Sequence, residues 1–215
     1  MKSFRLKIRH CLHVISVSID KMWEILLHVD FEDIVSLEDL KIDADHGEKY
    51  GPSTTRMLFN MRLFFKRIGI NRSDSIIDLG CGKGKVIYHL SKCGFGHVDG
   101  VELNAMLSET ARNNLKKLKV DLSMSTIFNI DAELFTDYDR YNWVYLFNPF
   151  PHSIAEKVVA NLETSIARKP RTVSIIYGNP KCEDVIMASK YFSTSRAIFR
   201  DVKLFELKNT AYRDG

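Results

Sequence analysis

A glycine-rich turn is the strongest chemical signal in the sequence. The run Ile76-Ile77-Asp78-Leu79-Gly80-Cys81-Gly82-Lys83-Gly84-Lys85 reads as an apolar strand, a tight turn and the start of a helix. Glycines at these spacings let the backbone take positive φ angles and approach a ligand closely. The helix amino terminus behind them offers free N–H groups. The pattern predicts a ligand-binding turn, although a tight turn with no ligand would contain the same residue types.

An acidic residue after the next predicted strand indicates the kind of ligand. Glu102 follows Gly84 by 18 residues and stands at the end of an apolar run. A carboxylate there can accept hydrogen bonds from two adjacent ribose hydroxyls, as in adenosine-binding Rossmann-type folds. An ordinary surface glutamate is the alternative interpretation. The spacing and the strand-end position together favour an adenosine ligand.

Two residues at the turn indicate which adenosine-containing ligand it would bind. The dinucleotide fingerprint G-x-G-x-x-G needs glycine at position 85, where this chain has Lys85. Asp78 places an acid at the turn, which would repel a pyrophosphate but suits a positively charged ligand. These residues favour S-adenosylmethionine, with its sulfonium and amino acid moiety, over NAD.

The ordered set of these elements resembles that of class I S-adenosylmethionine-dependent methyltransferases over residues 50–208. The matching segments are Asp78-Leu79-Gly80-Cys81-Gly82-Lys83-Gly84, Glu102, Asn129-Ile130-Asp131-Ala132 and Phe147-Asn148-Pro149-Phe150. The resemblance implies that Gly80, Cys81, Gly82 and Gly84 hold the methionine moiety near Asp78, Glu102 binds the ribose, Asp131 and Ala132 bind the adenine, and Asn148, Pro149 and Phe150 line the methyl-transfer site.

A narrower resemblance involves the segment ahead of the first strand. Tyr50-Gly51-Pro52-Ser53-Thr54 is similar to a loop of the non-SET protein-lysine methyltransferases. It implies a catalytic position for Tyr50 and a cofactor-binding position for Thr54. This chain differs from those enzymes in having Pro52 in place of an acid and Pro149 in place of an asparagine.

Asn148-Pro149-Phe150 also resembles the [Asn/Asp]-Pro-Pro-[Tyr/Phe] segment of amino-group methyltransferases. That resemblance implies that the Asn148 side chain accepts a hydrogen bond from the target nitrogen, which would orient its lone pair, and that the Phe150 ring faces the developing charge. Nitrogen is therefore the favoured acceptor; oxygen and carbon acceptors remain alternatives, as does a plain proline turn. His152 and Tyr177 stand near the same predicted rim without an assigned role.

Alternating strands and helices must position these residues. Strands are expected at 75–79, 97–103, 126–130, 143–147 and 172–177, with two more runs within 195–207, and helices at 4–29, 57–68, 85–93, 107–118, 154–166 and 181–191. Ser153 and Glu156 are spaced as a capping box. The order predicts an α/β fold: a doubly wound, mostly parallel, seven-stranded Rossmann-like sheet, with an added N-terminal helical segment. Residues 1–50 would form that extension and 51–215 the cofactor-binding domain.

Composition narrows the classes of partner. The 215 residues carry 31 Lys and Arg against 27 Asp and Glu, and four of the basic residues precede the first acid, Asp20. The remaining 27 basic residues balance the 27 acids, so bulk nucleic acid is an unfavoured partner. Helix 4–29 would pack on the domain or on a second subunit, or lie on a membrane surface.

Cysteine usage and hydropathy suggest the compartment. The four cysteines form no C-x-x-C pair, so we predict no metal site and a reducing, cytoplasmic location, with an organelle as the alternative because of the basic N-terminus. No apolar run approaches the roughly 20 residues of a membrane span.

These observations predict an S-adenosylmethionine-dependent methyltransferase acting on a nitrogen of a protein or small molecule. The alternatives are a catalytically silent scaffold with the same fold, and a nucleotide-dependent oxidoreductase, against which Lys85 argues.

Overall fold

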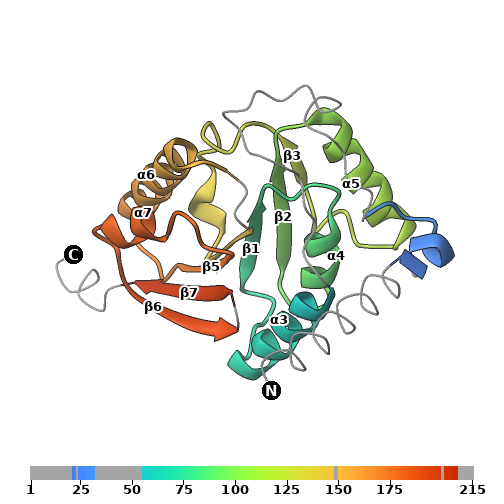
Figure 1. Cartoon of the computed structure of the whole chain (residues 1–215), viewed down its shortest axis with the longest axis horizontal. Helices are drawn as coiled ribbons and strands as arrows, with labels where there is room; N and C mark the ends of the chain where they lie inside the picture. Colours follow the sequence, from blue (N-terminus) through green and yellow to red (C-terminus); the bar gives the residue numbers. More distant parts are fainter. Residues whose placement is uncertain (1–20, 23, 32–54, 148–149, 200, 208–215) are drawn as a thin grey trace, which may run out of the picture.

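Seven strands form one sheet in the computed structural model, which describes residues 21–22, 24–31, 55–147, 150–199 and 201–207. The strands are β1 (Ser75–Leu79), β2 (His97–Glu102), β3 (Ile127–Asn129), β4 (Trp143–Phe147), β5 (Ser174–Gly178), β6 (Phe192–Phe199) and β7 (Val202–Leu207). Their order is β3-β2-β1-β4-β5-β7-β6 (Figure 1). The first five are parallel, and β7 runs antiparallel to both β5 and β6. The predicted fold class is confirmed, and the apolar 143–147 run is the central strand.

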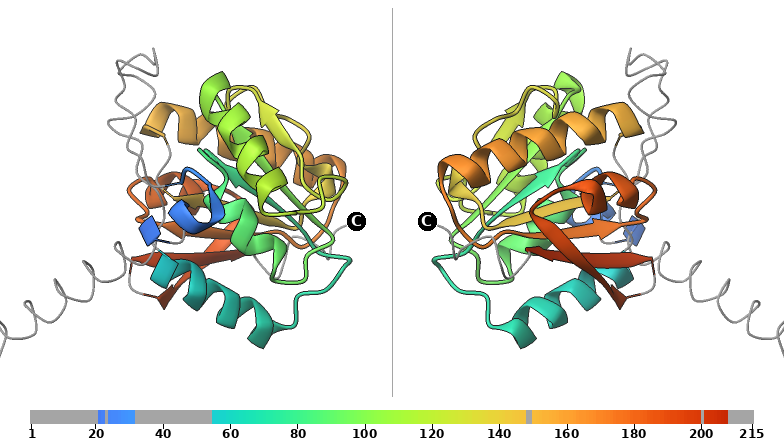
Figure 2. Two further views of the ribbon diagram at one scale, coloured as in Figure 1. Left: turned by 90° about the vertical axis from the view of Figure 1, so that its right-hand side faces the viewer. Right: turned by 90° about the vertical axis from the view of Figure 1, so that its left-hand side faces the viewer.

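Helices cover both faces of the sheet because its central strands are apolar on both sides. They are α3 (Thr55–Ile68), α4 (Lys85–Ser91), α5 (Ala105–Lys117), α6 (His152–Arg168) and α7 (Glu183–Ala188), with a short 3-10 helix, η2 (Tyr138–Arg140). Ile76 of β1 belongs to a core cluster with residues of α3, α4 and α5. Ile77 and Leu79 belong to the opposite cluster, with residues of α6, α7 and η2. The helices therefore form the outer layers on either side of the sheet (Figures 1 and 2).

The strand register brings the candidate site residues to one edge. Leu79 pairs with Val101, Glu102 pairs with Asn129, and Phe147 pairs with Gly178, so the strands end together. The strand order reverses between β1 and β4, which lie side by side while their following helices leave to opposite faces. In open α/β sheets this switch point is where ligands bind.

Two details of the helices differ from the sequence-based expectations. Helix α6 has Pro151 as its N-cap with no side-chain capping hydrogen bond, so the capping box of Ser153 and Glu156 is wrong. The helix begins directly after the proline, and the Glu156 carboxylate lies 3.4 Å from the His152 ring instead. The spacing of Met57, Met61, Phe64 and Ile68 predicts that these residues form the buried stripe of α3. Among the side chains of α3 that the structure describes, the fully buried ones are Leu58, Met61 and Phe65, whereas Ile68 is 41% exposed.

The chain before α3 is described only at residues 21–22 and 24–31, so most of the predicted 4–29 helix lies outside the described residues. Residues 24–27 are helical, and His28 follows with a φ of 53°. Met22, Ile25 and Leu26 are exposed, whereas Glu24, Val29 and Phe31 are buried. This segment, blue in Figure 2, lies beside α4 and α5. The division into 1–50 and 51–215 stays a prediction.

Gly84 should be more sensitive to substitution than Gly69, although both backbones are left-handed. Their φ angles are 82° and 79°, but an added Cβ at Gly84 would lie 3.1 Å from Ala111 Cβ, while nothing lies within 4 Å of one at Gly69. We expect Gly69→Ala to lower the free energy of unfolding by about 1–2 kcal/mol, the cost of a left-handed backbone. Gly84→Ala should cost more in the same urea titration; equal losses would mean that the helix-packing contact contributes nothing.

Candidate active site

The glycine turn joins β1 to α4 and is fastened to β2. Gly80, Gly82 and Gly84 have φ angles of 78°, 52° and 82°, which explains why glycine stands at these positions. The N–H groups of Gly80 and Cys81 both donate to the carbonyl of Val101, at 2.9 Å. The turn is therefore held against the strand that carries Glu102.

Cys81 is a packing residue of this turn. Its side chain is buried, and a Cβ at Gly100 of β2 would lie 2.6 Å from its Sγ, so the thiol fills the space that Gly100 leaves. Burial, followed by the charges of Asp78 and Glu102, raises the pKa of the Cys81 thiol well above its ordinary value. A neutral buried thiol is a poor nucleophile.

The Glu102 carboxylate links the glycine turn to the next helix. Its Oε2 accepts a hydrogen bond from the N–H of Gly82 at 2.9 Å, and its Oε1 accepts one from the N–H of Asn104 at 2.9 Å. Burial raises the pKa of Glu102, while these N–H donors lower it. Each carboxylate oxygen can accept a further hydrogen bond, so the group can still bind hydroxyl donors of a ligand.

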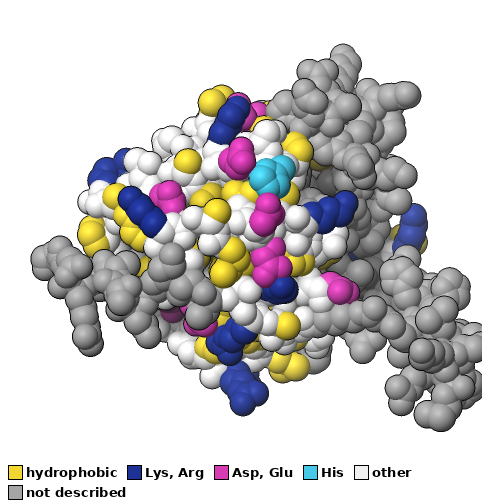
Figure 3. All heavy atoms as spheres, turned by 60° about the vertical axis from the view of Figure 1, so that its left-hand side comes forward, with side chains coloured by type: hydrophobic (Ala, Val, Ile, Leu, Met, Phe, Trp, Pro, Cys, Tyr) yellow, Lys and Arg dark blue, Asp and Glu magenta, His cyan; other side chains and the backbone are white. Residues whose placement is uncertain are grey.

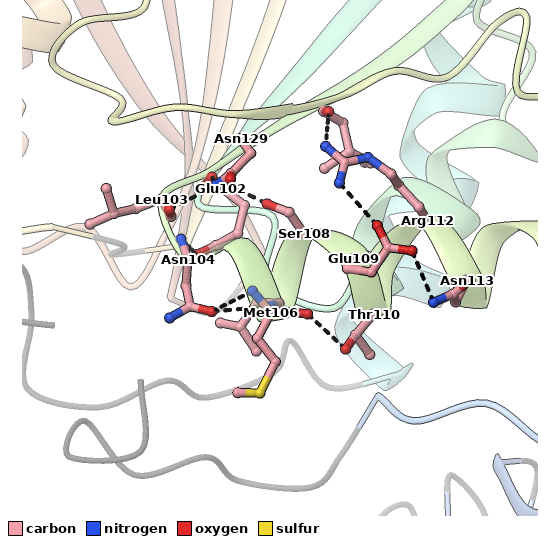
Figure 4. Close-up of polar contacts among 12 residues, drawn as sticks. Glu102, Leu103, Asn104, Met106, Ser108, Glu109, Thr110, Arg112, Asn113 and Asn129 are labelled. Atoms are coloured by element: carbon pink, nitrogen blue, oxygen red, sulfur yellow. Dashed lines mark hydrogen bonds and ion pairs between the residues drawn. The ribbon is translucent and has the colours of Figure 1, made fainter. Parts of the chain in front are cut away.

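Two polar side chains hold the end of β2 in place, and a third caps the helix that follows it (Figure 4). The Asn129 side chain donates to the carbonyls of Glu102 and Leu103, at 3.0 and 2.8 Å. The Ser108 hydroxyl donates to the Glu102 carbonyl at 3.3 Å, and Asn104 caps α5. Sequence reasoning missed these positioning roles. An asparagine just before a helix is a recognisable cap signal, but the Asn129 contact depends on β2 and β3 being neighbours.

Asp78 is the residue of the site whose buried polar atoms point most clearly to a ligand. It is 2% exposed, and among the described residues its Oδ2 and the Tyr138 hydroxyl are the two buried side-chain oxygens without a hydrogen-bond partner. Burial, and secondarily the charge of Glu102, raises the pKa of Asp78 well above its ordinary value. A buried carboxylate is stabilised by a cationic hydrogen-bond donor. The residues present therefore fit a ligand that brings positive charge to this turn.

Asp131 and Ala132 lie past the end of β3, at the same edge of the sheet. The Asp131 carboxylate accepts a hydrogen bond from the N–H of Glu133 at 3.0 Å, and Ala132 is buried in the core. Leu103 and Ile130, which follow β2 and β3, are 38% and 36% exposed at this edge. The turn, Glu102 and Asp131 thus come from three neighbouring strand ends.

The second half of the predicted site is described only in part. Phe150 is half-buried and packs against the core, whereas Asn148, Pro149, Tyr50 and Thr54 lie outside the described residues. Phe147, which precedes Asn148, covers Gly178 of β5: a Cβ there would lie 2.3 Å from the Phe147 ring. Gly178 therefore makes room for an aromatic side chain at the strand end.

Tyr177 and His152 occupy different environments near this rim. Tyr177 is 2% exposed, and its hydroxyl accepts a hydrogen bond from the N–H of Cys182 at 3.3 Å. His152 is exposed at the start of α6, and its Nε2 lies 2.8 Å from Oδ2 of Asp184 on α7. That carboxylate raises the pKa of His152. Tyr177 is thus part of the core, while His152 joins the ends of two helices.

In the part of the chain that the structure describes, no group of three or more His, Cys, Asp or Glu side chains is arranged to hold a metal ion. No described helix is long and apolar enough to cross a membrane.

Comparison with known proteins shows what part of the chain is similar to. Residues 76–169 match a family model described as a methyltransferase domain. The ribosomal protein L11 methyltransferase of Burkholderia mallei is 24% identical over 107 residues, which are 48% of this chain and 33% of that protein. The chain therefore spans about a third of the length of the curated relatives it matches.

Solved structures share the fold. An RNA methyltransferase from Salinibacter ruber in complex with S-adenosyl-L-homocysteine aligns with a TM-score of 0.53 at 15% identity, over 76% of this chain and 97% of that one. Magnesium protoporphyrin IX methyltransferase from Synechocystis with bound S-adenosylmethionine aligns with a TM-score of 0.51 at 16% identity, over 70% and 77%. Those two structures hold S-adenosyl-L-homocysteine and S-adenosylmethionine, and the two enzymes are named for very different acceptors.

Removing the Glu102 carboxylate should weaken cofactor binding. Glu102→Ala deletes an acceptor for ligand hydroxyls and the anchor of the Gly82 N–H, so we expect a loss of about 2–3 kcal/mol in S-adenosylhomocysteine affinity by titration calorimetry. Glu109→Ala, an exposed acid on the neighbouring helix, is the matched control and should bind as the unmodified chain does. Unchanged affinity of Glu102→Ala would place the ribose elsewhere.

The raised pKa of Asp78 predicts that cofactor binding releases a proton. Below that pKa the carboxyl is protonated in the free protein, and a cationic ligand favours its ionised form. Affinity for S-adenosylmethionine, which carries a sulfonium as well as an ammonium group, should therefore rise with pH and level off above the pKa. Calorimetry in buffers of different ionisation enthalpy measures the proton released.

Asp78→Asn is the test of that assignment. It should abolish the released proton, because the amide does not titrate. It should also remove a pH dependence of stability: a carboxyl whose pKa is raised on folding stabilises the ligand-free fold at low pH and loses that contribution as pH rises through the folded pKa. Proton release that persists undiminished in Asp78→Asn would assign it to another group.

Proposed function

We propose that this chain is a class I (Rossmann-like) S-adenosylmethionine-dependent methyltransferase that transfers a methyl group to a nitrogen of a protein or small-molecule acceptor. The observation that carries the cofactor half of the proposal is the buried carboxylate of Asp78 at the glycine turn, whose Oδ2 has no hydrogen-bond partner. It suits the ammonium group of the cofactor's amino acid end, while the adjacent Glu102 suits a ribose.

In this proposal the cofactor residues come from successive strand ends. The glycine turn at 80–84 would hold the methionine moiety with Asp78 beside it, and Glu102 would bind the ribose hydroxyls. Asp131 and Ala132 would bind the adenine, and Thr54 would contribute from the segment ahead of α3. Support comes from the position of the turn, Glu102 and Asp131 at one sheet edge.

The bound cofactor would supply a methyl group activated by its sulfonium, which is already a good leaving group. The residues after β4 would then position the acceptor. The Asn148 side chain would accept a hydrogen bond from the acceptor N–H and so aim the nitrogen lone pair, while Phe150, with Tyr50 and Pro149, would line and dehydrate the transfer site. The acceptor nitrogen would become positively charged as it takes the methyl group, with S-adenosylhomocysteine as the leaving group, and it would then lose one of its own protons to solvent.

Nitrogen as the acceptor atom rests on the Asn148-Pro149-Phe150 segment and its resemblance to amino-group methyltransferases. The Tyr50 to Thr54 segment adds a weaker likeness to protein-lysine methyltransferases. Bulk nucleic acid is disfavoured by the balanced charge after residue 19. The face in Figure 3 likewise mixes basic with acidic and apolar side chains rather than presenting a basic surface. A cytoplasmic location stays a prediction.

Calorimetry with the intact chain tests the cofactor assignment. S-adenosylhomocysteine should bind and raise the melting temperature, since a ligand that binds the native state stabilises it. NAD should do neither, because Lys85 replaces the glycine of the dinucleotide fingerprint. Tight binding of NAD would favour the oxidoreductase alternative. Binding of neither compound would favour a scaffold without catalytic function.

Substitution of Asn148 should separate chemistry from cofactor binding. We expect Asn148→Ala to lower turnover about a hundredfold through misorientation of the acceptor, with little change in S-adenosylhomocysteine affinity. The assay is release of S-adenosylhomocysteine with a panel of lysine-bearing peptides and small amines. Asn113→Ala, an exposed residue of α5, is the control. Equal losses in turnover and affinity would instead assign Asn148 to cofactor binding.

A further inference from the structure

A segment near the N-terminus packs against the helices that follow the glycine turn. In residues 24–31, the buried Phe31 ring stacks on Tyr88 of α4 with centroids 6.5 Å apart. The Lys117 ammonium of α5 donates to the His28 carbonyl at 2.6 Å. The Phe31 N–H donates to the Glu24 carboxylate at 2.6 Å, which closes the segment on itself. The segment is thus fixed to both helices.

From this segment Asp30 reaches the glycine turn itself. Lys83 stands between Gly82 and Gly84, and its side chain is only 3% exposed. Its ammonium lies 2.6 Å from the Asp30 carboxylate, which is 45% exposed. A buried ammonium is strongly stabilised by an anionic partner. Loss of this ion pair should therefore cost more free energy than loss of a pair on the surface.

Asn114 of α5 ties the backbones of Asp30 and Lys83 together. Its side-chain N–H groups donate to the Lys83 carbonyl at 3.0 Å and to the Asp30 carbonyl at 2.7 Å, while its oxygen accepts from the Asp30 N–H at 3.1 Å. Asn114 is 2% exposed. The turn is therefore held from outside by Asp30 and Asn114, and from the sheet side by Glu102 through Gly82.

We propose that Asp30 is a positioning residue for the cofactor turn, so that the N-terminal segment completes the S-adenosylmethionine site. This inference rests on the proposed function and deepens it. Three glycines give the turn many accessible conformations, and ordering them before the ligand arrives lowers the cost of binding. The Asp30 carboxylate also neutralises the Lys83 ammonium, which would otherwise repel a cationic ligand at the same turn.

Asp30→Asn is the variant that tests the proposal, because it keeps the side-chain shape and removes the charge. We expect the dissociation constant for S-adenosylhomocysteine to rise about 5- to 20-fold, which is a typical size for the energetic coupling between a contact outside a site and binding at that site. Asp137→Asn, an exposed acid just before η2 on the opposite side of the sheet from the turn, is the matched control and should bind normally. Asp30→Glu should recover part of the loss.

A double-mutant cycle separates the ion pair from a general loss of stability. In a Lys83→Met background, Asp30→Asn should change the dissociation constant by less than about twofold, because its partner is gone. Hydrogen exchange gives a second readout: Asp30→Asn should speed exchange at residues 80–85 but leave the strands unchanged. A purely structural role would instead speed exchange across the sheet.

The outcomes distinguish the two proposals. Normal binding by Asp30→Asn, or an undiminished effect in the Lys83→Met background, would overturn the role of Asp30 while leaving the methyltransferase assignment intact. Failure of the unmodified chain to bind S-adenosylhomocysteine would overturn the proposed function, and the role of Asp30 with it.

Discussion

The hydrogen bond from the Gly82 N–H to the Glu102 carboxylate is the contact on which the site depends. It joins a turn after β1 to the end of β2, so it exists only when the two strands are in register. The bonds from Gly80 and Cys81 to the Val101 carbonyl support the same alignment. Because glycine adds no side-chain constraint, the turn depends on these partners for its shape.

The electrostatics of the turn follow from this arrangement. Asp78 and Glu102 are both buried, and the proximity of their charges contributes to the raised pKa of Asp78. Lys83 is buried in the same turn but is paired with Asp30 outside the sheet. Two carboxyl groups therefore lie on the sheet side of the turn, while the Lys83 ammonium is paired with Asp30 on its other side. Such a site favours a cationic ligand over a pyrophosphate.

The apolar strands were predictable because buried parallel strands are continuous apolar runs. β1 and β4 begin and end at the predicted residues, and the others differ in their bounds by a few residues. The expectations that failed concern helix surfaces. Helix α6 starts after Pro151 without a side-chain cap, and α3 buries Phe65 rather than Ile68. Periodicity identifies an amphipathic helix, but the rotation that it adopts depends on the surface against which it packs.

Local sequence by itself determined the strand–turn–helix at Asp78 to Lys85 and the acid one strand later, because those features depend on glycine spacing and on the length of one βαβ unit. Tertiary structure alone decided what holds that turn. Asp30 and Lys83 are 53 residues apart, and Asn114 lies 84 residues from Asp30. No periodicity or spacing relates residues at such distances; only the packing of residues 24–31 on α4 and α5 brings them together.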